Sequence, residues 1–416
     1  MWWKGAVIYE LYADKFAGNF AGLSDKLDYL KNLGINCVHI LPHYPSPMID
    51  DGYDVSDYKG IRPELGTLDD FKKMAGRAHA MGIKVIVDLV LNHASTMHHL
   101  FVDASKKESA SRNMFLWSKT GKEFPEAVNA FSRVKPKNWI WHPASGEYYF
   151  STFYPEQADF NWKNPAVFDF FIDIMDFWVD MGADGFRLDA ASHIVKKEGT
   201  NCKSLPETHA ILMKLRKHID KSYSDVILLA EVHDGIMKTK EYFNQGAECH
   251  LTYNFYLTER IFLSLVRADR SIFDYALKEC EEIPQNSAWA NFLRCHDEIS
   301  LSWLTDAERK EVIDIFDPQR KYQFEAYTAM RLASMFKGDK EKILEAFRML
   351  FLSPGAHIIY YGDEIGMENE KISAGEDVRR VVRGKFDWAM ADIEMASSSS
   401  LFSNIKNIIA EHAEGK

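Results

Sequence analysis

The 416-residue sequence has little of several features that would indicate other classes of protein. It has only five cysteines, without C-x-x-C spacing, which disfavours a disulfide framework or a zinc site and fits a reducing compartment. A net charge of −11 disfavours a nucleic-acid partner, which would require a basic face. No apolar run approaches the length of a membrane span, and the first residues show no signal peptide. We therefore expect a cytoplasmic protein without membrane or nucleic-acid partners, whose oligomeric state is left open.

Glycine-rich phosphate-binding patterns are also missing after every predicted strand, which disfavours an open nucleotide-binding sheet. The sequence does contain eight short β-branched runs that alternate with helical patterns. These predicted strands are residues 6–12, 37–42, 84–93, 185–190, 226–232, 248–255, 290–297 and 357–365. Eight strands in this alternation predict an α/β fold of the (β/α)₈ TIM barrel type.

Amphipathic patterns predict helices between these strands, at residues 22–34, 68–81, 166–181, 207–220, 259–281, 341–352 and 399–412. Two connections are much longer than a barrel loop requires. Residues 94–164 predict a small subdomain inserted after the third strand, and residues 299–339 predict a helical insertion. The barrel itself would comprise residues 1–93 and 165–416.

Polar side chains gather at the predicted carboxyl ends of the strands, where the active site of such a barrel lies. In "GADGFRLDA", two charged side chains share one face of an otherwise apolar strand, and burying such a pair rarely stabilises a fold by itself. A surface salt bridge or simple capping groups would be the structural alternative. The rim residues are Asp189, Glu231, Asp297, His93, His296 and Arg187. Their convergence predicts an active site.

Paired carboxylates at a barrel mouth suit glycoside hydrolysis, in which one acid protonates the leaving oxygen while an ionised partner attacks the anomeric carbon. Arg187 is expected to keep Asp189 ionised and oriented. Glu231 follows the apolar run "VILLA" and has no basic neighbour in sequence, so it is the better candidate for the protonated acid.

The segments "DLVLNH", "GFRLDAASH", "AEV" and "FLRCHDE", in this order, resemble the four hallmark regions of the α-amylase superfamily of glycoside hydrolases, family 13. A fifth region resembles "QADFN" at 157–161. The resemblance implies that Asp189 is the nucleophile, Glu231 the acid/base, and Asp297 the third carboxylate, which holds and distorts the sugar. It also implies that His93, Arg187 and His296 line the same subsite, and it implies no cofactor.

The stretches "YPSPMIDDGYDVSDY" and "FLRCHDEISL" are similar to trehalose synthases and, less closely, to amylosucrases and oligo-α-glucosidases. Those enzymes close the pocket for the terminal glucose with an Asp–Arg pair. The pair maps onto Asp50 and Arg379, with Arg380 and Arg383 as alternatives for the arginine. The same likeness adds two aromatic residues to this pocket, Tyr53 and Phe153. A closed pocket implies exo action on small α-glucosides.

The sequence departs from these relatives in its metal-binding residues. The calcium loop after the first strand is missing, and a second calcium site would use Asn92, Asp159 and an acid at position 196, which here is Lys196. We therefore expect no calcium there, and an ammonium contact with one or both oxygen-bearing side chains. The usual carboxy-terminal β-sandwich is also absent from the sequence, which we expect to weaken closure over the site.

Three functions are compatible with these residues. The leading hypothesis is a retaining exo-acting α-glucosidase on maltose-, sucrose- or trehalose-like sugars, with some transglycosylation. The alternative is a glucosyltransferase or isomerase of the trehalose synthase or amylosucrase type, which must hold the freed sugar and exclude water. A catalytically inactive scaffold is disfavoured because all three acids are present. In each case the expected partner is a small α-glucoside.

Overall fold

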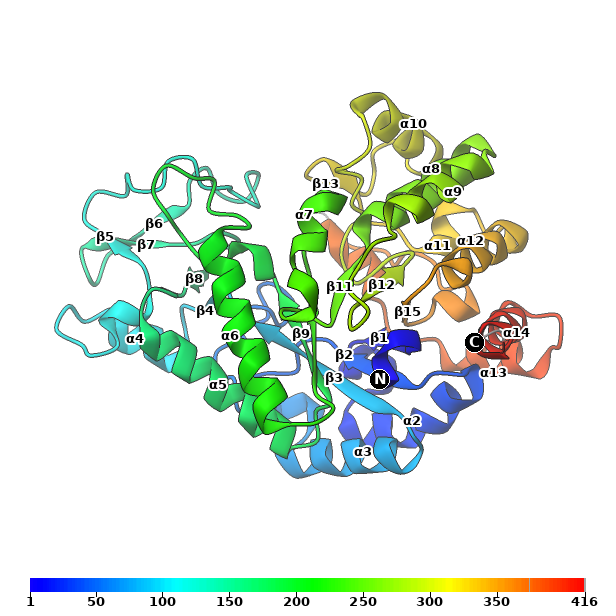
Figure 1. The fold of residues 1–416 in the computed structure, drawn as a ribbon, viewed down its shortest axis with the longest axis horizontal. Coiled ribbons are helices and arrows are strands. Elements are labelled where there is room, and N and C mark those ends of the chain that lie inside the picture. The colour runs from blue at the N-terminus through cyan, green and yellow to red at the C-terminus, as the bar shows by residue number, and fades with distance from the viewer. Residues whose placement is uncertain (374, 415–416) are drawn as a thin grey trace.

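The computed structural model describes residues 1–373 and 375–414, and its core is a closed barrel of eight parallel strands (Figure 1). In chain order the barrel strands are β1 (Val7–Leu11), β2 (Cys37–Ile40), β3 (Lys84–Val90), β9 (Gly185–Asp189), β10 (Ile227–Ala230), β11 (Leu251–Tyr253), β12 (Ala288–Phe292) and β15 (Ala356–Tyr360). The last strand pairs with the first and closes the barrel. The predicted TIM barrel is confirmed.

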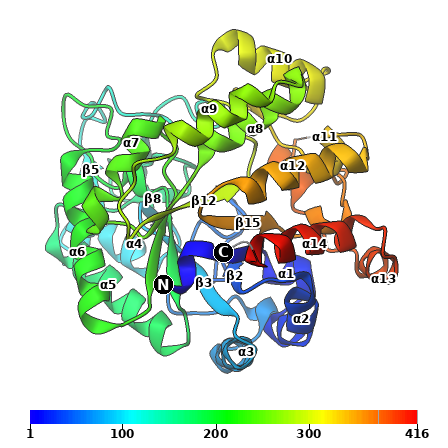
Figure 2. The same cartoon turned by 45° about the vertical axis from the view of Figure 1, so that its right-hand side comes forward.

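Helices surround the barrel and cover its outer surface (Figure 2). They are α1 (Ala13–Ala17), α2 (Phe20–Leu33), α3 (Leu68–Ala80), α5 (Pro165–Asp180), α6 (Pro206–Ser222), α7 (Ile236–Glu241), α8 (Phe255–Arg267), α9 (Arg270–Glu279), α12 (Lys340–Leu352), α13 (Trp388–Ala396) and α14 (Leu401–Glu414). In α2, for example, Leu23, Leu27 and Leu30 are fully buried at helical spacing, and left-handed Gly34 follows its last residue.

The prediction of one continuous helix over 259–281 is wrong, because α8 and α9 are separate helices that pack against each other. Ala268 adopts a left-handed backbone with φ of 51°, which ends α8. The Asp269 side chain then accepts a hydrogen bond from the Ser271 amide and begins α9. Residues with good helix propensity lie on both sides of this turn, so the hydrophobic periodicity of the sequence did not reveal it.

The first inserted segment forms small antiparallel sheets beside the barrel rim (Figure 1). At its base, β4 (His93–Ser95) pairs with β8 (Gln157–Asp159), which joins both ends of the insertion to the barrel. The outer part contains α4 (His99–Ala104) and a sheet of β5 (Trp117–Ser118), β7 (Glu147–Phe150) and β6 (Trp139–His142). The segment therefore stands on the edge where the barrel strands end.

The second inserted segment contains more than the expected helices. It has α10 (Asp306–Phe316) and α11 (Leu332–Met335), but also a hairpin of β13 (Gln323–Phe324) and β14 (Tyr327–Thr328). A capping box between Thr305 and Glu308 begins α10. The hairpin reaches the first insertion, where the Phe131 and Phe324 ring centroids are 5.4 Å apart.

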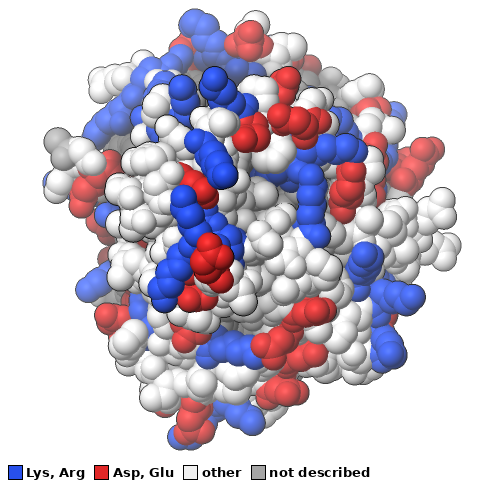
Figure 3. Space-filling view, turned by 90° about the vertical axis from the view of Figure 1, so that its left-hand side faces the viewer, with Lys and Arg blue, Asp and Glu red and all other residues white. Residues whose placement is uncertain are grey.

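The surface carries charges of both signs. On the face drawn in Figure 3, Lys and Arg side chains lie interspersed with Asp and Glu, without a broad area of one sign. Among residues 1–373 and 375–414, no helix combines the length and the apolar character that crossing a membrane requires.

Candidate active site

A pocket of about 430 Å³ opens at the carboxyl ends of the barrel strands, within the size range of small-molecule sites. The three carboxylates predicted from the strand ends, Asp189, Glu231 and Asp297, all line it. Five of the other predicted residues also line it: Asp50, Tyr53, His93, Phe153 and Arg379. Arg187 and His296 are not part of this lining and lie behind it, in contact with the lining carboxylates.

Arg187, on β9, is buried and contacts three carboxylates rather than the single one expected. Its Nη1 lies 2.7 Å from Asp88 and 2.6 Å from Asp189, and its Nη2 lies 2.8 Å from Glu231. One guanidinium therefore bridges the predicted nucleophile and the predicted acid. Such bridging suits the short separation, about 5–5.5 Å, between the carboxyl groups of retaining glycosidases.

The shared arginine changes the expected electrostatics of the pair. Burial raises the pKa of Asp189 well above its usual value, Arg187 opposes this shift, and the nearby Glu231 adds to it. Arg187 contacts Asp189 and favours its ionised form, as expected, but it divides its charge among three acids, so burial and the neighbouring acids outweigh it.

Asp297 has the opposite electrostatic environment. Its carboxylate lies 3.0 Å from His296 Nε2, 3.1 Å from Arg379 Nη1 and 2.6 Å from Arg383 Nη2. Burial by itself would raise the pKa of Asp297, but these three cations hold it well below its usual range. Asp297 is consequently the carboxylate that stays ionised.

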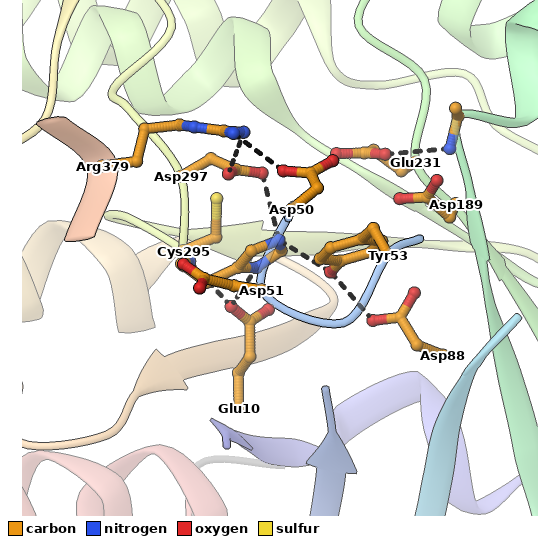
Figure 4. A network of polar contacts seen from close by, with 12 residues as sticks. Glu10, Asp50, Asp51, Tyr53, Asp88, Asp189, Glu231, Cys295, Asp297 and Arg379 are labelled. Atoms are coloured by element: carbon orange, nitrogen blue, oxygen red, sulfur yellow. Dashed lines mark hydrogen bonds and ion pairs between the residues drawn. The ribbon is translucent and has the colours of Figure 1, made fainter. Parts of the chain in front are cut away.

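The predicted pair between Asp50 and Arg379 is present in the pocket lining (Figure 4). Asp50 Oδ1 lies 2.8 Å from Arg379 Nη2, and both side chains are buried. Gln157, from the inserted segment, donates to the other Asp50 oxygen at 2.9 Å. This geometry confirms the predicted ion pair; what the pair binds is a separate question.

The alternative arginines have other partners. Arg380 and Arg383 both contact Asp51, at 3.0 and 2.6 Å. Asp377, which precedes the 3₁₀ helix η7 (Val378–Val382), contacts Arg379 Nη2 at 2.7 Å. Sequence reasoning missed both acids, although the acidic run "IDDGYD" and the basic run "VRRVVR" are complementary in charge.

Aromatic rings form the remaining walls. Tyr53 stacks on His296 with centroids 5.3 Å apart and planes 15° apart, and Phe153 packs against His93 at 5.3 Å. Two rings that the sequence did not reveal, Phe131 and Phe324, lie over the Arg379 guanidinium, at 5.1 and 4.6 Å. They come from the two insertions, where no motif marks them.

The predicted contacts of Lys196 are confirmed. Its Nζ lies 2.9 Å from Asn92 Oδ1 and 2.8 Å from Asp159 Oδ2. The ammonium occupies the space between these two oxygens and neutralises the one carboxylate. This donor set therefore does not fit a divalent cation, which needs several oxygen ligands of its own.

Comparison with known proteins identifies the class of this barrel and site. The model of the alpha-amylase catalytic domain matches residues 9–399, so the chain belongs to the alpha-amylase family.

Among curated proteins, the chain is similar to the trehalose synthase of Thermus thermophilus, with 40% identity over 397 residues, or 94% of this chain and 41% of that protein. It is 38% identical over 400 residues to the trehalose synthase/amylase of Mycolicibacterium smegmatis, covering 93% of this chain and 67% of that protein. A more distant relative is the trehalose-6-phosphate hydrolase of Escherichia coli, 30% identical over 404 residues, 91% of this chain and 68% of that protein. The chain thus spans less than half of the Thermus protein.

Solved structures give the same fold at lower identity. The sucrose 6F-phosphate phosphorylase of Thermoanaerobacter thermosaccharolyticum superposes with a TM-score of 0.84 and 23% identity, over 100% of this chain and 87% of that one. The trehalulose synthase MutB of Pseudomonas mesoacidophila gives 0.79 and 23%, over 100% and 84%. At this identity the likeness establishes the fold alone.

Proposed function

We propose that the chain is the catalytic domain of a retaining, glucosyl-transferring enzyme that isomerises small α-glucosides of the maltose and trehalose type. The observation that carries this proposal is a pocket lined by the ion pair of Asp50 and Arg379 together with Asp189, Glu231 and Asp297. Such a pocket has room for one terminal glucose unit next to the paired carboxylates. Plain exo hydrolysis, our first hypothesis, becomes the competing outcome of the same chemistry.

In the first step the terminal glucose lies against the blind end, where Asp50 and Arg379 hydrogen-bond to its far hydroxyls. Asp189 attacks the anomeric carbon while Glu231 donates a proton to the glycosidic oxygen, so the bond to the leaving sugar breaks and a glucosyl ester forms. Ionised Asp297 holds ring hydroxyls and stabilises the positive charge that develops on the ring.

In the second step Glu231 acts as a base and takes a proton from the acceptor hydroxyl, which attacks the anomeric carbon and releases Asp189. If the acceptor is water, the product is glucose. If it is another hydroxyl of the retained leaving sugar, the product is an isomeric disaccharide. The outcome therefore depends on whether water reaches the intermediate.

Two observations favour transfer over hydrolysis. Curated relatives with 38–40% identity are named trehalose synthases. In addition, the insertions meet across the pocket entrance: Glu325 accepts hydrogen bonds from the Arg133 amide at 3.1 Å and from Ser132 Oγ at 3.2 Å. These contacts supply a cover over the pocket from the barrel's own insertions.

The test is to incubate the protein separately with maltose, trehalose, sucrose and isomaltose and to follow the products by chromatography. A new disaccharide from maltose or trehalose supports the proposal. Glucose as the sole product would return the assignment to an exo-acting α-glucosidase, and absence of turnover on all four sugars would contradict both. Asp189→Asn, which lacks the nucleophile, is the control for contaminating activity.

A further inference from the structure

Glu10 is a fully buried carboxylate that lies beneath the pocket and does not line it (Figure 4). It is the only charged residue of β1 and comes from the sequence "VIYEL". Its Oε1 accepts hydrogen bonds from both the backbone N and the Nδ1 of His296, each at 3.0 Å, and its Oε2 accepts one from the Tyr253 hydroxyl at 3.0 Å. An ionised carboxylate without direct water contact requires such partners.

On one side of Glu10, His296 connects it to the active site. While Nδ1 of His296 points to Glu10, Nε2 lies 3.0 Å from the Asp297 carboxylate and 2.7 Å from the Tyr53 hydroxyl. A neutral imidazole has a single N–H and cannot donate at both nitrogens. The two carboxylates on opposite nitrogens therefore require the imidazolium form.

On its other side, Glu10 connects to the remaining catalytic acids through a second histidine. Glu10 Oε2 lies 3.3 Å from His39 Nδ1, and His39 Nε2 lies 3.2 Å from Asp88. Asp88 in turn contacts Arg187, the guanidinium that bridges Asp189 and Glu231. Acids and bases alternate along this buried path, so each charge has an opposite charge beside it.

We propose that Glu10 is a positioning residue of the active site, which keeps His296 in its imidazolium form and thereby fixes the contact of His296 with Asp297. The inference rests on the proposed function, because it assumes that Asp297 acts on a bound glucoside. Without the Glu10 charge, one imidazole nitrogen would lose its acceptor, and burial would favour the neutral ring. Asp297 would then lose one of its three cationic partners.

The expected pH dependence follows from the groups that face His296. These are Glu10, Asp297, Asp88, Tyr53, Tyr12 and Arg383. Burial lowers the pKa of His296, but Asp297 and Glu10 outweigh it and raise the pKa to about 10. The imidazolium is therefore present at neutral pH and is lost only as the pH rises toward 10. Removing one of the two carboxylates would lower the pH at which the imidazolium is lost.

The experiment compares Glu10→Gln with Glu364→Gln, using hydrolysis of p-nitrophenyl α-glucoside between pH 5 and 10. Glu364 is an equally buried acid beside the barrel, but its partners are the hydroxyls of Tyr9 and Tyr29. We expect kcat/KM of Glu10→Gln to fall roughly 10-fold at pH 6 and about 10²-fold at pH 9, with the alkaline limb shifted down by at least about one unit. We expect Glu364→Gln to keep the wild-type profile.

A Glu10→Gln profile parallel to that of the wild type would overturn the proposal, because a structural role alone does not depend on pH in this way. If the variant does not fold, the ring nitrogens of the wild-type histidines, labelled with ¹⁵N, provide the second measurement. His296, assigned by comparison with His296→Asn, should remain an imidazolium at pH 8, and a neutral ring there would also overturn it. If the wild type cleaves no α-glucoside, the proposed function fails, but the NMR result still decides the role of Glu10.

Discussion

The two ends of the pocket are built from different kinds of side chain. At the proposed blind end, charged groups hold one another: buried Arg379 contacts Asp50, Asp377 and Asp297. At the proposed entrance, the rings of Phe131 and Phe324 meet between the two insertions, and both also lie over the Arg379 guanidinium. Trp303, also in the lining, is 36% exposed there.

This difference separates two tasks. The ion pairs around Arg379 have fixed geometry, and in the proposed function they would hold the hydroxyls of one glucose, which hydrolysis and transfer both require. The rings of Phe131 and Phe324 pack on each other and on the Arg379 guanidinium, and in the proposed function they limit which acceptor reaches the glucosyl intermediate. Substitutions at the blind end should therefore lower all products together, whereas substitutions at the entrance should change their ratio.

The largest effect is expected between the two ends, at the nucleophile. Asp189→Asn removes the group that forms the glucosyl ester, so formation of glucose and of new disaccharide should both fall by about 10⁴-fold or more. Asp184→Asn is the control, because Asp184 precedes the same strand at the opposite end of the barrel and pairs with Lys84. Substantial residual transfer by Asp189→Asn would exclude the ester mechanism.

A smaller effect is expected at the blind end. Asp50→Ala removes one sugar contact and the acceptor of Gln157, while Arg379 keeps Asp377 as a partner. We expect kcat/KM on disaccharides to fall about 10²-fold, roughly 3 kcal/mol, with the product ratio unchanged. Asp69→Ala, which breaks an exposed pair with Lys73, should have no effect. A near-wild-type Asp50→Ala enzyme would mean that the pair does not touch the sugar.

Substitutions at the entrance should change the ratio of glucose to isomeric disaccharide among the products. Phe324→Ala removes the ring that packs on Phe131, so water should gain access to the pocket. The ratio of glucose to isomer should then rise about 10-fold, which corresponds to a change of about 1.4 kcal/mol in the difference between the barriers to hydrolysis and to transfer. Consumption of the disaccharide should change much less. Trp141→Ala is the control, because Trp141 lies in the first insertion, as Phe131 does, but is 50% exposed and does not line the pocket. An unchanged ratio of glucose to isomer in Phe324→Ala would show that these rings do not limit the access of water.

The smallest effect is expected from metal removal. Because Lys196 already neutralises Asp159, EDTA should change neither the kcat nor the melting temperature of the protein. The measurement is a thermal melt and an activity assay with and without chelator. Inactivation that calcium reverses would show that the reasoning about Lys196 is wrong.

The sequence predicted the barrel well because each strand is a short apolar run bounded by loops, and βα alternation leaves few topologies. The break between α8 and α9 was missed because Ala268 has high helix propensity, and its left-handed backbone is stabilised by the cap that follows. The hairpin in the second insertion was missed because its strands are only two residues long.

The three carboxylates of the pocket were predictable because they lie at or soon after the ends of barrel strands, on the rim where such barrels act. The contact between Asp51 and Arg383 was not predictable, because 332 positions separate the two residues and no local pattern pairs two loops. The reasoning applied to Arg187 could also have singled out Glu10 and His39, since each is a polar residue within an apolar strand. Sequence order cannot show that they meet beneath the pocket, because their contact depends on barrel closure.

The most direct test of the central claim is whether the glucose released from the first bond stays in the pocket. Maltose would be incubated with the protein in an excess of uniformly ¹³C-labelled glucose, and the mass of any new disaccharide would be measured. The account predicts a trehalose-type product that is almost free of label, because the covered pocket keeps the leaving sugar as the acceptor. A product that carries label from the solution, or unlabelled glucose as the sole product, would contradict it.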